Sequence, residues 1–196
     1  MNVEDCIKKR FSVRQYKKKT VPWKTLAKII NLARYAPSSG NIQNWDLVVV
    51  SEKNVKEEIA KACFGQEWME DAFCFFVVCN NLSKAERSYG ERGRDLYSVQ
   101  NCALFAYNIM LETYNLGLGS CWVGAFDEQK VTEILELPRH IRPEAVITLG
   151  YPDEKQKRKE RDDPESFCFF EKYGNKERDI KMLPLGKSVK RLVRKL

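Results

Sequence analysis

The sequence lacks any apolar run long enough to cross a bilayer. Its longest such run, residues 72–79, has eight residues, whereas a membrane-spanning helix needs about 20. The N-terminus also lacks the apolar segment of a signal peptide, because the first residues lead directly into charged ones. We therefore expect a cytoplasmic protein that does not enter a membrane.

The sequence is also poor in residues that bind metals. Its only histidine, His140, has no cysteine near it, and the seven cysteines include no Cys-x-x-Cys pair. Structural zinc and iron–sulfur sites need clustered ligands. Most of the cysteines stand among apolar residues, where a free cysteine acts as a small buried hydrophobe. We expect no metal site and reduced, buried thiols.

Composition places the chain among globular proteins. Of its 196 residues, 43% are hydrophobic and 31% are charged, which is typical neither of membrane proteins nor of disordered chains. This length fits one domain with a sizeable core. We find no internal repeat.

The net charge of +7 is unevenly distributed. Residues 1–34 carry +8, residues 35–150 carry −6, and residues 151–196 carry +5. The basic ends could simply be solvated surface. Alternatively, both ends contribute to one site for an anion, and the motifs described below favour this second interpretation.

Hydrophobic periodicity predicts alternating helices and strands. The residues at 72–79 read as a strand buried on both faces, and the polar residues at 80–97 read as a loop. We expect helices at 3–9, from Pro22 to 33, at 54–63, at 97–116 (a long buried helix with Val99, Cys102, Ala103, Ala106, Ile109 and Met110 on its apolar face) and at 131–137, and further strands at 46–50 and 144–150.

The stretch Ala36-Pro-Ser-Ser-Gly-Asn-Ile-Gln-Asn-Trp45 joins a predicted helix to a predicted strand. Pro37 ends the helix, and Gly40 allows a close backbone approach. Hydroxyl and carboxamide groups follow one another at Ser38, Ser39, Asn41 and Gln43. They donate and accept hydrogen bonds without charge, which suits the edge of a heteroaromatic ring. A polar turn that only caps the helix is the alternative.

A second motif, Arg10-Phe-Ser-Val-Arg14, alternates polar and apolar residues. In an extended segment Arg10, Ser12 and Arg14 share one face. Two guanidinium groups beside a hydroxyl predict a site for a phosphate or another delocalised anion.

Together these motifs resemble the FMN-dependent nitroreductase family. The order Arg-x-Ser-x-Arg, Val21-Pro22, helix and residues 36–45 is similar to the usual opening of that family. The resemblance continues through Gly150-Tyr-Pro152 to about Gly174. It implies an α+β fold with a mostly antiparallel central sheet flanked by helices, in an intertwined homodimer. The implied domain spans residues 1–174, and residues 175–196 form a basic extension.

The segment Leu116-Gly-Leu-Gly-Ser-Cys-Trp-Val-Gly-Ala125 contains a Gly-x-Gly sequence. The segment does not match the dinucleotide-binding fingerprint, because it follows a helix instead of a strand and its third glycine falls at the wrong interval. The segment instead resembles a family turn that passes over one face of the flavin. A glycine-rich turn leading into a strand remains an alternative.

By this resemblance the chain binds FMN and uses NAD(P)H as reductant. The chemistry takes place at the flavin N5, so no side chain is expected to be catalytic. Arg10 and Ser12 are expected near the phosphate, Arg14 near N1 and O2 of the ring, and Ser38 and Ser39 at the partner subunit's flavin. The implied binding residues are Arg10, Phe11, Ser12, Arg14, Pro37, Ser38, Ser39, Asn41, Gln43, Val123, Gly124, Ala125, Lys159 and Arg161.

The resemblance implies an oxidoreductase that passes reducing equivalents to a nitroaromatic, a quinone or a similar small organic acceptor by a ping-pong mechanism. Residues 80–97 are the expected substrate lid, with Tyr89 and Tyr97 as candidate pocket residues, and residues 167–173 resemble a closing strand that crosses to the partner. A dehalogenase, an enone reductase or a flavin-cannibalising synthase would share the FMN motifs. A nucleic-acid or membrane-surface module would use the basic ends but leave both polar motifs without a role, and we expect neither partner.

Overall fold

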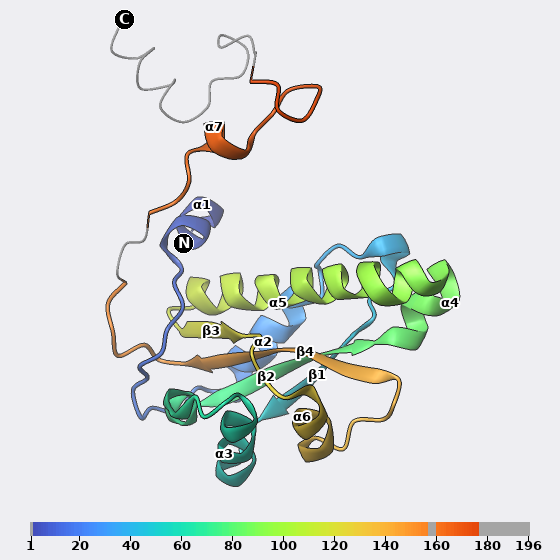
Figure 1. The fold of residues 1–196 in the computed structure, drawn as a ribbon. Helices are drawn as coiled ribbons and strands as arrows, with labels where there is room; N and C mark the ends of the chain where they lie inside the picture. Colours follow the sequence, from blue (N-terminus) through green and yellow to red (C-terminus); the bar gives the residue numbers. More distant parts are fainter. Residues whose placement is uncertain (1, 157–159, 177–196) are drawn as a thin grey trace, which may run out of the picture. The chain divides into compact units, whose positions relative to one another are not determined.

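The computed structural model of the chain describes residues 2–156 and 160–176. Its centre is one antiparallel four-stranded sheet with the order β1-β2-β4-β3 (Figure 1). The predicted α+β class with a mostly antiparallel sheet is confirmed. The strands are β1 (Trp45–Val50), β2 (Cys74–Asn81), β3 (Gly119–Val123) and β4 (Ile141–Gly150).

Helices precede, separate and follow these strands. The helices are α1 (Val3–Lys9), α2 (Trp23–Ala33), α3 (Lys53–Ala62), α4 (Leu82–Arg92), α5 (Ser98–Asn115), α6 (Glu128–Ile134) and α7 (Pro164–Phe167), with the short turns η1 (Ser39–Asn41), η2 (Glu67–Asp71) and the π-turn η3 (Gly93–Tyr97).

The sheet lies between two layers of helices. On one face Phe76 and Val78 of β2 pack in a cluster with residues of α2 and α5, and on the other Phe75 and Val77 pack with residues of α3 and α6. Alternate residues of a strand point to opposite faces, and β2 is buried on both, as predicted. Burying one such side chain stabilises the fold by about 1.5–3 kcal/mol. The buried sheet is therefore a stable support for segments that pack along its edge.

The prediction of a loop at residues 80–97 is wrong. The segment forms α4 and η3, which continue into α5. Only Ala85 of α4 is buried, so this surface helix has almost no apolar period for a sequence pattern to reveal. Gly90 interrupts it with φ 60° and ψ −151°, a conformation open essentially to glycine alone.

The long helix is confirmed as α5, but its buried face differs from the predicted one. Ala103 is exposed and Val99 half-buried, whereas Phe105 lies in the core. Asn101 is also buried, at 3% exposure. The buried face of α5 thus includes a polar side chain near the start of the helix, and it differs from the face predicted from apolar residues alone.

The chain divides into two compact units, Met1–Gln156 and Lys157–Leu196. In the described part of the second unit, 160–176, residues 164–167 form α7 and no strand occurs, so the closing strand expected at 167–173 is absent there. A strand needs a neighbouring strand for its backbone groups. The domain boundary after Gly174 stays a prediction, and residues 177–196 lie outside the described part.

Candidate functional site

The first predicted motif lies in an extended segment at the sheet edge, residues 10–16, which we call the N-terminal arm. Ser12 forms a parallel bridge with Ser120 of β3, and the Val13 amide donates to the Ser120 carbonyl at 3.0 Å. Since β3 is the last strand of the sheet, the arm extends that edge. A short span of backbone pairing therefore fixes the register of the motif.

Tyr16 fastens the other end of the arm. Its hydroxyl donates to the Val13 carbonyl at 2.8 Å and lies 2.7 Å from Thr148 Oγ1 in β4. Burial raises the pKa of the Tyr16 phenol above its ordinary value, so the group stays neutral and acts as a structural hydrogen bond. The arm is thus held to two strands by both backbone and side chain.

Two glycines explain the Leu-Gly-Leu-Gly sequence in physical terms. Gly117 has φ 76°, which the turn after α5 requires. A Cβ at Gly119 would lie 2.6 Å from Val13 Cγ2, so only glycine lets the arm pack this closely on β3. The turn after α5 and the packing of the arm on β3 therefore explain the glycine pattern without a dinucleotide.

The charged side chains of the arm gather around Cys121. Burial raises the pKa of the Cys121 thiol, and the positive charges of Arg14 and Arg10 oppose that effect, together with a hydrogen bond to Ser12. The Arg10 guanidinium also lies 5.4 Å from the ring of Tyr107 in α5. The Arg14 guanidinium lies 5.7 Å from the ring of Trp68 in η2, so the two arginines pack on different rings, and a shared site for one anion stays a prediction.

Neither guanidinium group of the arm is paired with a carboxylate in the described part of the chain. Among residues 2–156 and 160–176, neither Arg10 nor Arg14 forms an ion pair, and the buried Arg10 Nε has no hydrogen-bond acceptor. A buried donor without an acceptor costs about 1–3 kcal/mol. An anion such as a phosphate would supply the missing acceptor, so these residues fit the phosphate end of FMN.

Glu154 is a residue that sequence analysis missed. One of its oxygens, Oε1, accepts hydrogen bonds from the backbone amides of Arg14 (2.5 Å) and Gln15 (3.2 Å). It shapes the arm by binding backbone amides and forms no ion pair with the Arg14 guanidinium. No local pattern marks this role, because 140 residues separate Glu154 from Arg14.

The second predicted motif, residues 38–43, is a strained loop with hydrogen bonds between its own residues. Gly40, Asn41 and Gln43 all have positive φ, at 53°, 57° and 49°, and for a non-glycine residue this costs about 1–2 kcal/mol. The Gln43 amide donates to Ser38 Oγ at 3.1 Å, and Gln43 Nε2 donates to Asn41 Oδ1 at 3.0 Å. The polar groups predicted to meet a ring thus also hold one another in place.

Two contacts from outside hold this loop. A Cβ at Gly40 would lie 2.5 Å from Tyr89 Oη of α4. The Ser39 amide donates to Asn101 Oδ1 at 3.0 Å, and Asn101 Nδ2 donates to Ser39 Oγ at 2.9 Å. In the sequence, Asn101 stands out only as a carboxamide within a mostly apolar helix, and no role was predicted for it.

The glycine-rich segment 116–125 begins in the turn after α5 and continues through β3. Val123 ends the strand and is buried, whereas Gly124 and Ala125 follow it and are exposed. The alternative of a glycine-rich turn leading into a strand is therefore correct for Gly117–Val123. Val123 lies three residues beyond the Ser120 bridge, about 10 Å along the strand, so residues 123–125 lie in the same region as the arm.

The remaining predicted residues differ in how far the structure describes them. Phe11 is half-buried against the core cluster on the α3 and α6 side of the sheet, and Pro37 is exposed before the 38–43 loop. Arg161 is exposed in the second compact unit. Lys159 lies outside the described residues.

The arm and the 38–43 loop contact different parts of α5. The loop is bound by Asn101 near the start of the helix, while Arg10 lies over Tyr107 further along and α1 lies beside its C-terminal half. In Figure 1 the loop lies at the α4 end of α5 and α1 at the opposite end. Among the described residues no hydrogen bond or ion pair joins arm residues 10–14 to loop residues 38–43.

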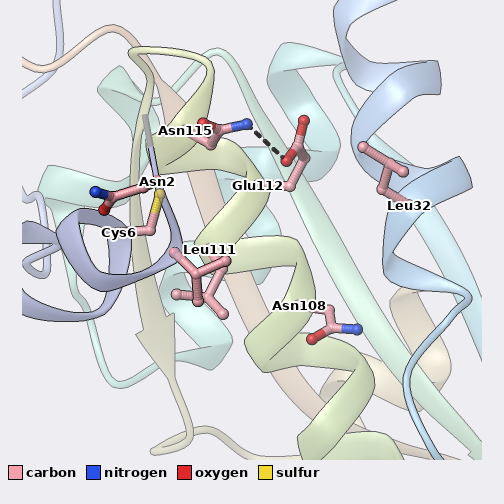
Figure 2. A pocket seen from close by; sticks show the side chains of 8 residues that line it. Asn2, Cys6, Leu32, Asn108, Leu111, Glu112 and Asn115 are labelled. Atoms are coloured by element: carbon pink, nitrogen blue, oxygen red, sulfur yellow. Dashed lines mark hydrogen bonds between the residues drawn. The ribbon is translucent and has the colours of Figure 1, made fainter.

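A separate cavity of about 250 Å³ lies between α1, α2 and α5 (Figure 2). In it Asn115 Nδ2 donates to Glu112 Oε2 at 3.0 Å. None of the residues predicted to bind a cofactor lines it; its lining consists of Asn2, Val3, Cys6, Leu32, Asn108, Leu111, Glu112 and Asn115.

Two negative findings apply to the described part of the chain. No group of three or more histidine, cysteine, aspartate and glutamate side chains there is arranged to hold a metal ion. No helix there has the length and apolar character that crossing a membrane demands.

Comparison with known proteins adds a family. The model of the nitroreductase family matches residues 7–71 and 62–151. A putative NADH dehydrogenase/NAD(P)H nitroreductase of Methanothermobacter thermautotrophicus is 31% identical over 169 residues, covering 84% of this chain and 85% of that protein. An FMN reductase [NAD(P)H] of Bacillus subtilis is 30% identical over 180 residues, covering 85% and 72%. The solved structure of an FMN-dependent nitroreductase of Clostridium difficile superposes with a TM-score of 0.75 at 25% identity, covering 87% and 99%.

Proposed function

The chain belongs to the nitroreductase family, and we propose that it is an FMN-dependent oxidoreductase that transfers reducing equivalents from NAD(P)H to a small organic acceptor by a ping-pong mechanism. Nitroaromatic compounds and quinones are the proposed acceptors. The observation that carries this proposal is the buried Nε of Arg10, which has no hydrogen-bond acceptor among the described residues. The names of the relatives support both the reductant and the flavin.

The arm would hold the two ends of the flavin. When bound, FMN supplies the two-electron redox chemistry, for which no catalytic side chain is needed. Arg10 and Ser12 would bind the phosphate, because a guanidinium forms strong charge-assisted hydrogen bonds with it. Arg14 would stabilise the negative charge that reduction places near N1 and O2 of the ring. Val123, Gly124 and Ala125 would contact the flavin face.

We further propose that the site is completed by a second copy of the chain. Ser38 and Ser39 would bind the flavin held by the partner's arm, and Asn41 and Gln43 would address the pyrimidine edge and the ribityl chain of the flavin. Supporting this, no bond links arm and loop within the described part of one chain, and large apolar side chains are exposed on α1, α2 and α5. These include Val3 (71% exposed), Trp23 (61%) and Leu104 (42%), a pattern typical of a surface that is covered in an assembly.

Four finer expectations also enter the proposal. The family resemblance assigns Lys159 and Arg161 to the phosphate, and Phe11 and Pro37 would border the flavin site. Residues 1–174 would form the flavin domain, with 175–196 as its basic extension. We also propose a cytoplasmic location.

Free flavin is a second candidate acceptor. It is favoured by one specific observation, that a relative 30% identical to this chain bears the name FMN reductase. The two candidates share the reductive half of the cycle and differ only in which molecule takes the electrons. Competition between menadione and free FMN for the reduced enzyme would separate them.

The proposal is tested by the purified protein itself. We expect a yellow protein that releases FMN on denaturation, is bleached by NADH or NADPH without oxygen, and regains its colour when p-nitrobenzoate or menadione is added. Initial rates at several fixed acceptor concentrations should give parallel double-reciprocal lines. A protein that remains colourless after incubation with FMN would contradict the proposal.

A further inference from the structure

A chain of buried carboxamides runs from the sheet to the 38–43 loop. Asn44, Asn80 and Asn101 are 0%, 0% and 3% exposed. Asn44 Nδ2 donates to Asn80 Oδ1 at 2.9 Å, and Asn101 Nδ2 donates to Asn44 Oδ1 at 2.7 Å. Asn101 in turn makes the two bonds to Ser39 described above. Buried polar groups are costly unless every one is satisfied, so this chain constrains the loop strongly.

The partners at its inner end fix the direction of the chain. The Ser98 carbonyl, which only accepts, receives Asn44 Nδ2 at 3.1 Å, and the Glu144 carboxylate receives Asn80 Nδ2 at 2.6 Å. Turning either amide over would bring oxygen against oxygen. Asn44 must therefore present its oxygen to Asn101, and Asn101 must present its NH₂ group to Asn44 and to Ser39 Oγ.

This direction determines what Ser39 can do. Because Ser39 Oγ accepts from Asn101 Nδ2, the hydroxyl proton cannot point toward Asn101. That proton has no acceptor among the described residues, and Ser39 is only half-buried. A hydroxyl that is held as an acceptor on its inner side becomes an oriented donor on its outer side.

We propose that Asn101 is a positioning residue that presents the Ser39 hydroxyl as a hydrogen-bond donor to an acceptor atom of the bound flavin. The acceptor is a ring carbonyl oxygen, a ring nitrogen without a proton, or an oxygen of the ribityl phosphate chain. This inference rests on the proposed function, because it assumes that FMN is the ligand. In this proposal Asn101 affects FMN binding only through the Ser39 hydroxyl.

A double-mutant cycle in the full chain tests this route. Asn101→Asp replaces the NH₂ group by oxygen, so the Ser39 hydroxyl would turn inward and donate to the new carboxylate. Ser39→Ala removes the hydroxyl itself. We expect either change to weaken FMN binding by about three- to tenfold, and the double variant to bind no more weakly than the single ones. Such non-additivity is expected of two residues that act through one contact.

Urea denaturation of the flavin-free variants provides the control for a merely structural role. Asn101→Asp should lower stability far more than Ser39→Ala does, while both lower FMN affinity equally. If FMN affinity instead follows stability, or if the two effects multiply in the double variant, the proposal is wrong.

A measurement on the wild-type protein needs neither variant nor FMN. The Ser39 amide, bonded to the buried Asn101 side chain, should exchange with deuterium at least tenfold more slowly than the same tripeptide in an unfolded chain. Exchange at the unfolded rate would overturn the positioning role. A protein that fails to bind FMN but protects this amide would contradict the proposed function and leave the Asn101–Ser39 contact standing, whereas FMN binding with an additive cycle would contradict only the present inference.

Discussion

At the scale of the residue, the decisive feature is positive charge that the protein does not neutralise. Arg10 and Arg14 lie near the same thiol, Cys121, with no carboxylate paired to either guanidinium among the described residues. Glu154 comes close but accepts from backbone amides of the arm. Positive charge that is not paired within the protein attracts anions from solution.

The two arginines should differ in which part of the flavin they bind. Arg10→Ala should weaken FMN binding by about ten- to more than a hundredfold, the loss of one charge-assisted hydrogen bond worth about 1.5–3 kcal/mol. Its effect on riboflavin, which has no phosphate, should be small. Arg14→Ala should weaken both ligands alike and lower the reduction potential of the bound flavin. Fluorescence titration with both flavins and a potentiometric titration measure this.

Arg139, an exposed arginine after α6, gives the matched control. Arg139→Ala should leave both affinities and the potential unchanged. If Arg10→Ala weakens riboflavin as much as FMN, Arg10 does not bind the phosphate.

Gly40 offers a second test, because two effects of substitution can be separated there. Gly40 and Gly65 both have positive φ, at 53° and 69°, but a Cβ at Gly65 would meet nothing within 4 Å. Gly65→Ala should therefore cost only the backbone strain, about 1–2 kcal/mol. Gly40→Ala should cost more in urea denaturation and should also weaken FMN binding, because its Cβ displaces Tyr89.

Removing the obstructing atom should reverse the second effect. In Gly40→Ala/Tyr89→Phe the nearest atom to the new Cβ would be ring carbon Cζ, 3.4 Å away, an ordinary contact. The double variant should then behave like Gly65→Ala in stability. No recovery would mean that the strain of the loop, and not Tyr89, makes glycine necessary.

The sequence predicted the residues that act locally and missed those that act across the fold. Arg10, Ser12 and Gly40 stand in short motifs whose chemistry can be read from neighbouring residues. Asn101 and Glu154 act on segments 62 and 140 residues away, so nothing beside them in the chain indicates a partner. The dependence of such roles on tertiary contacts explains why they appear only in the structure.

At the scale of the element, burial governed what could be predicted. The strand β2 and the helix α5 carry enough apolar residues for their type to be read from the sequence, although the polar Asn101 shifted the buried face of α5. The helix α4 buries only Ala85 and was taken for a loop, because a solvated helix leaves no apolar stripe. The same burial affects the chemistry of the cysteines in the core.

Burial of thiols in α3 and β2 should make the protein unstable in alkali. Burial raises the pKa of Cys63, at the end of α3, and of Cys74 and Cys79 in β2 from 9.0 to about 12. Below pH 9 both native and unfolded chains keep these protons. Between pH 9 and 12 the unfolded chain releases them and the native one does not, so the free energy of unfolding falls as pH rises, by about 1.4 kcal/mol per pH unit for each thiol.

Urea denaturation between pH 7 and 11 measures this slope. Cys79→Ala should reduce it by about one thiol's share. An unaltered slope in Cys79→Ala would show that other groups cause the alkaline loss.

At the scale of the whole molecule, the proposal that two chains share each flavin site depends on where the arm and the loop lie. The arm lies along β3, the loop is held by Asn101 and Tyr89, and the described residues supply no bond between them. Val3, Trp23 and Leu104 leave large apolar side chains exposed on α1, α2 and α5. In a symmetric dimer both contacts occur twice, so each of two equivalent sites can combine one chain's arm with the other chain's loop.

Subunit mixing tests this arrangement directly. Arg10→Ala damages the arm and Gly40→Ala damages the loop, so each homodimer should bind FMN weakly at both sites. In a heterodimer of the two variants, isolated through different affinity tags, a shared site predicts one site with both lesions and one with neither. The heterodimer should therefore bind one FMN with wild-type affinity and show about half of the wild-type activity, measured by fluorescence titration and NAD(P)H oxidation. If arm and loop of the same chain formed the site, every site of the heterodimer would carry one lesion, and no wild-type affinity would reappear. A protein that sediments as a monomer with FMN bound would exclude the shared site altogether.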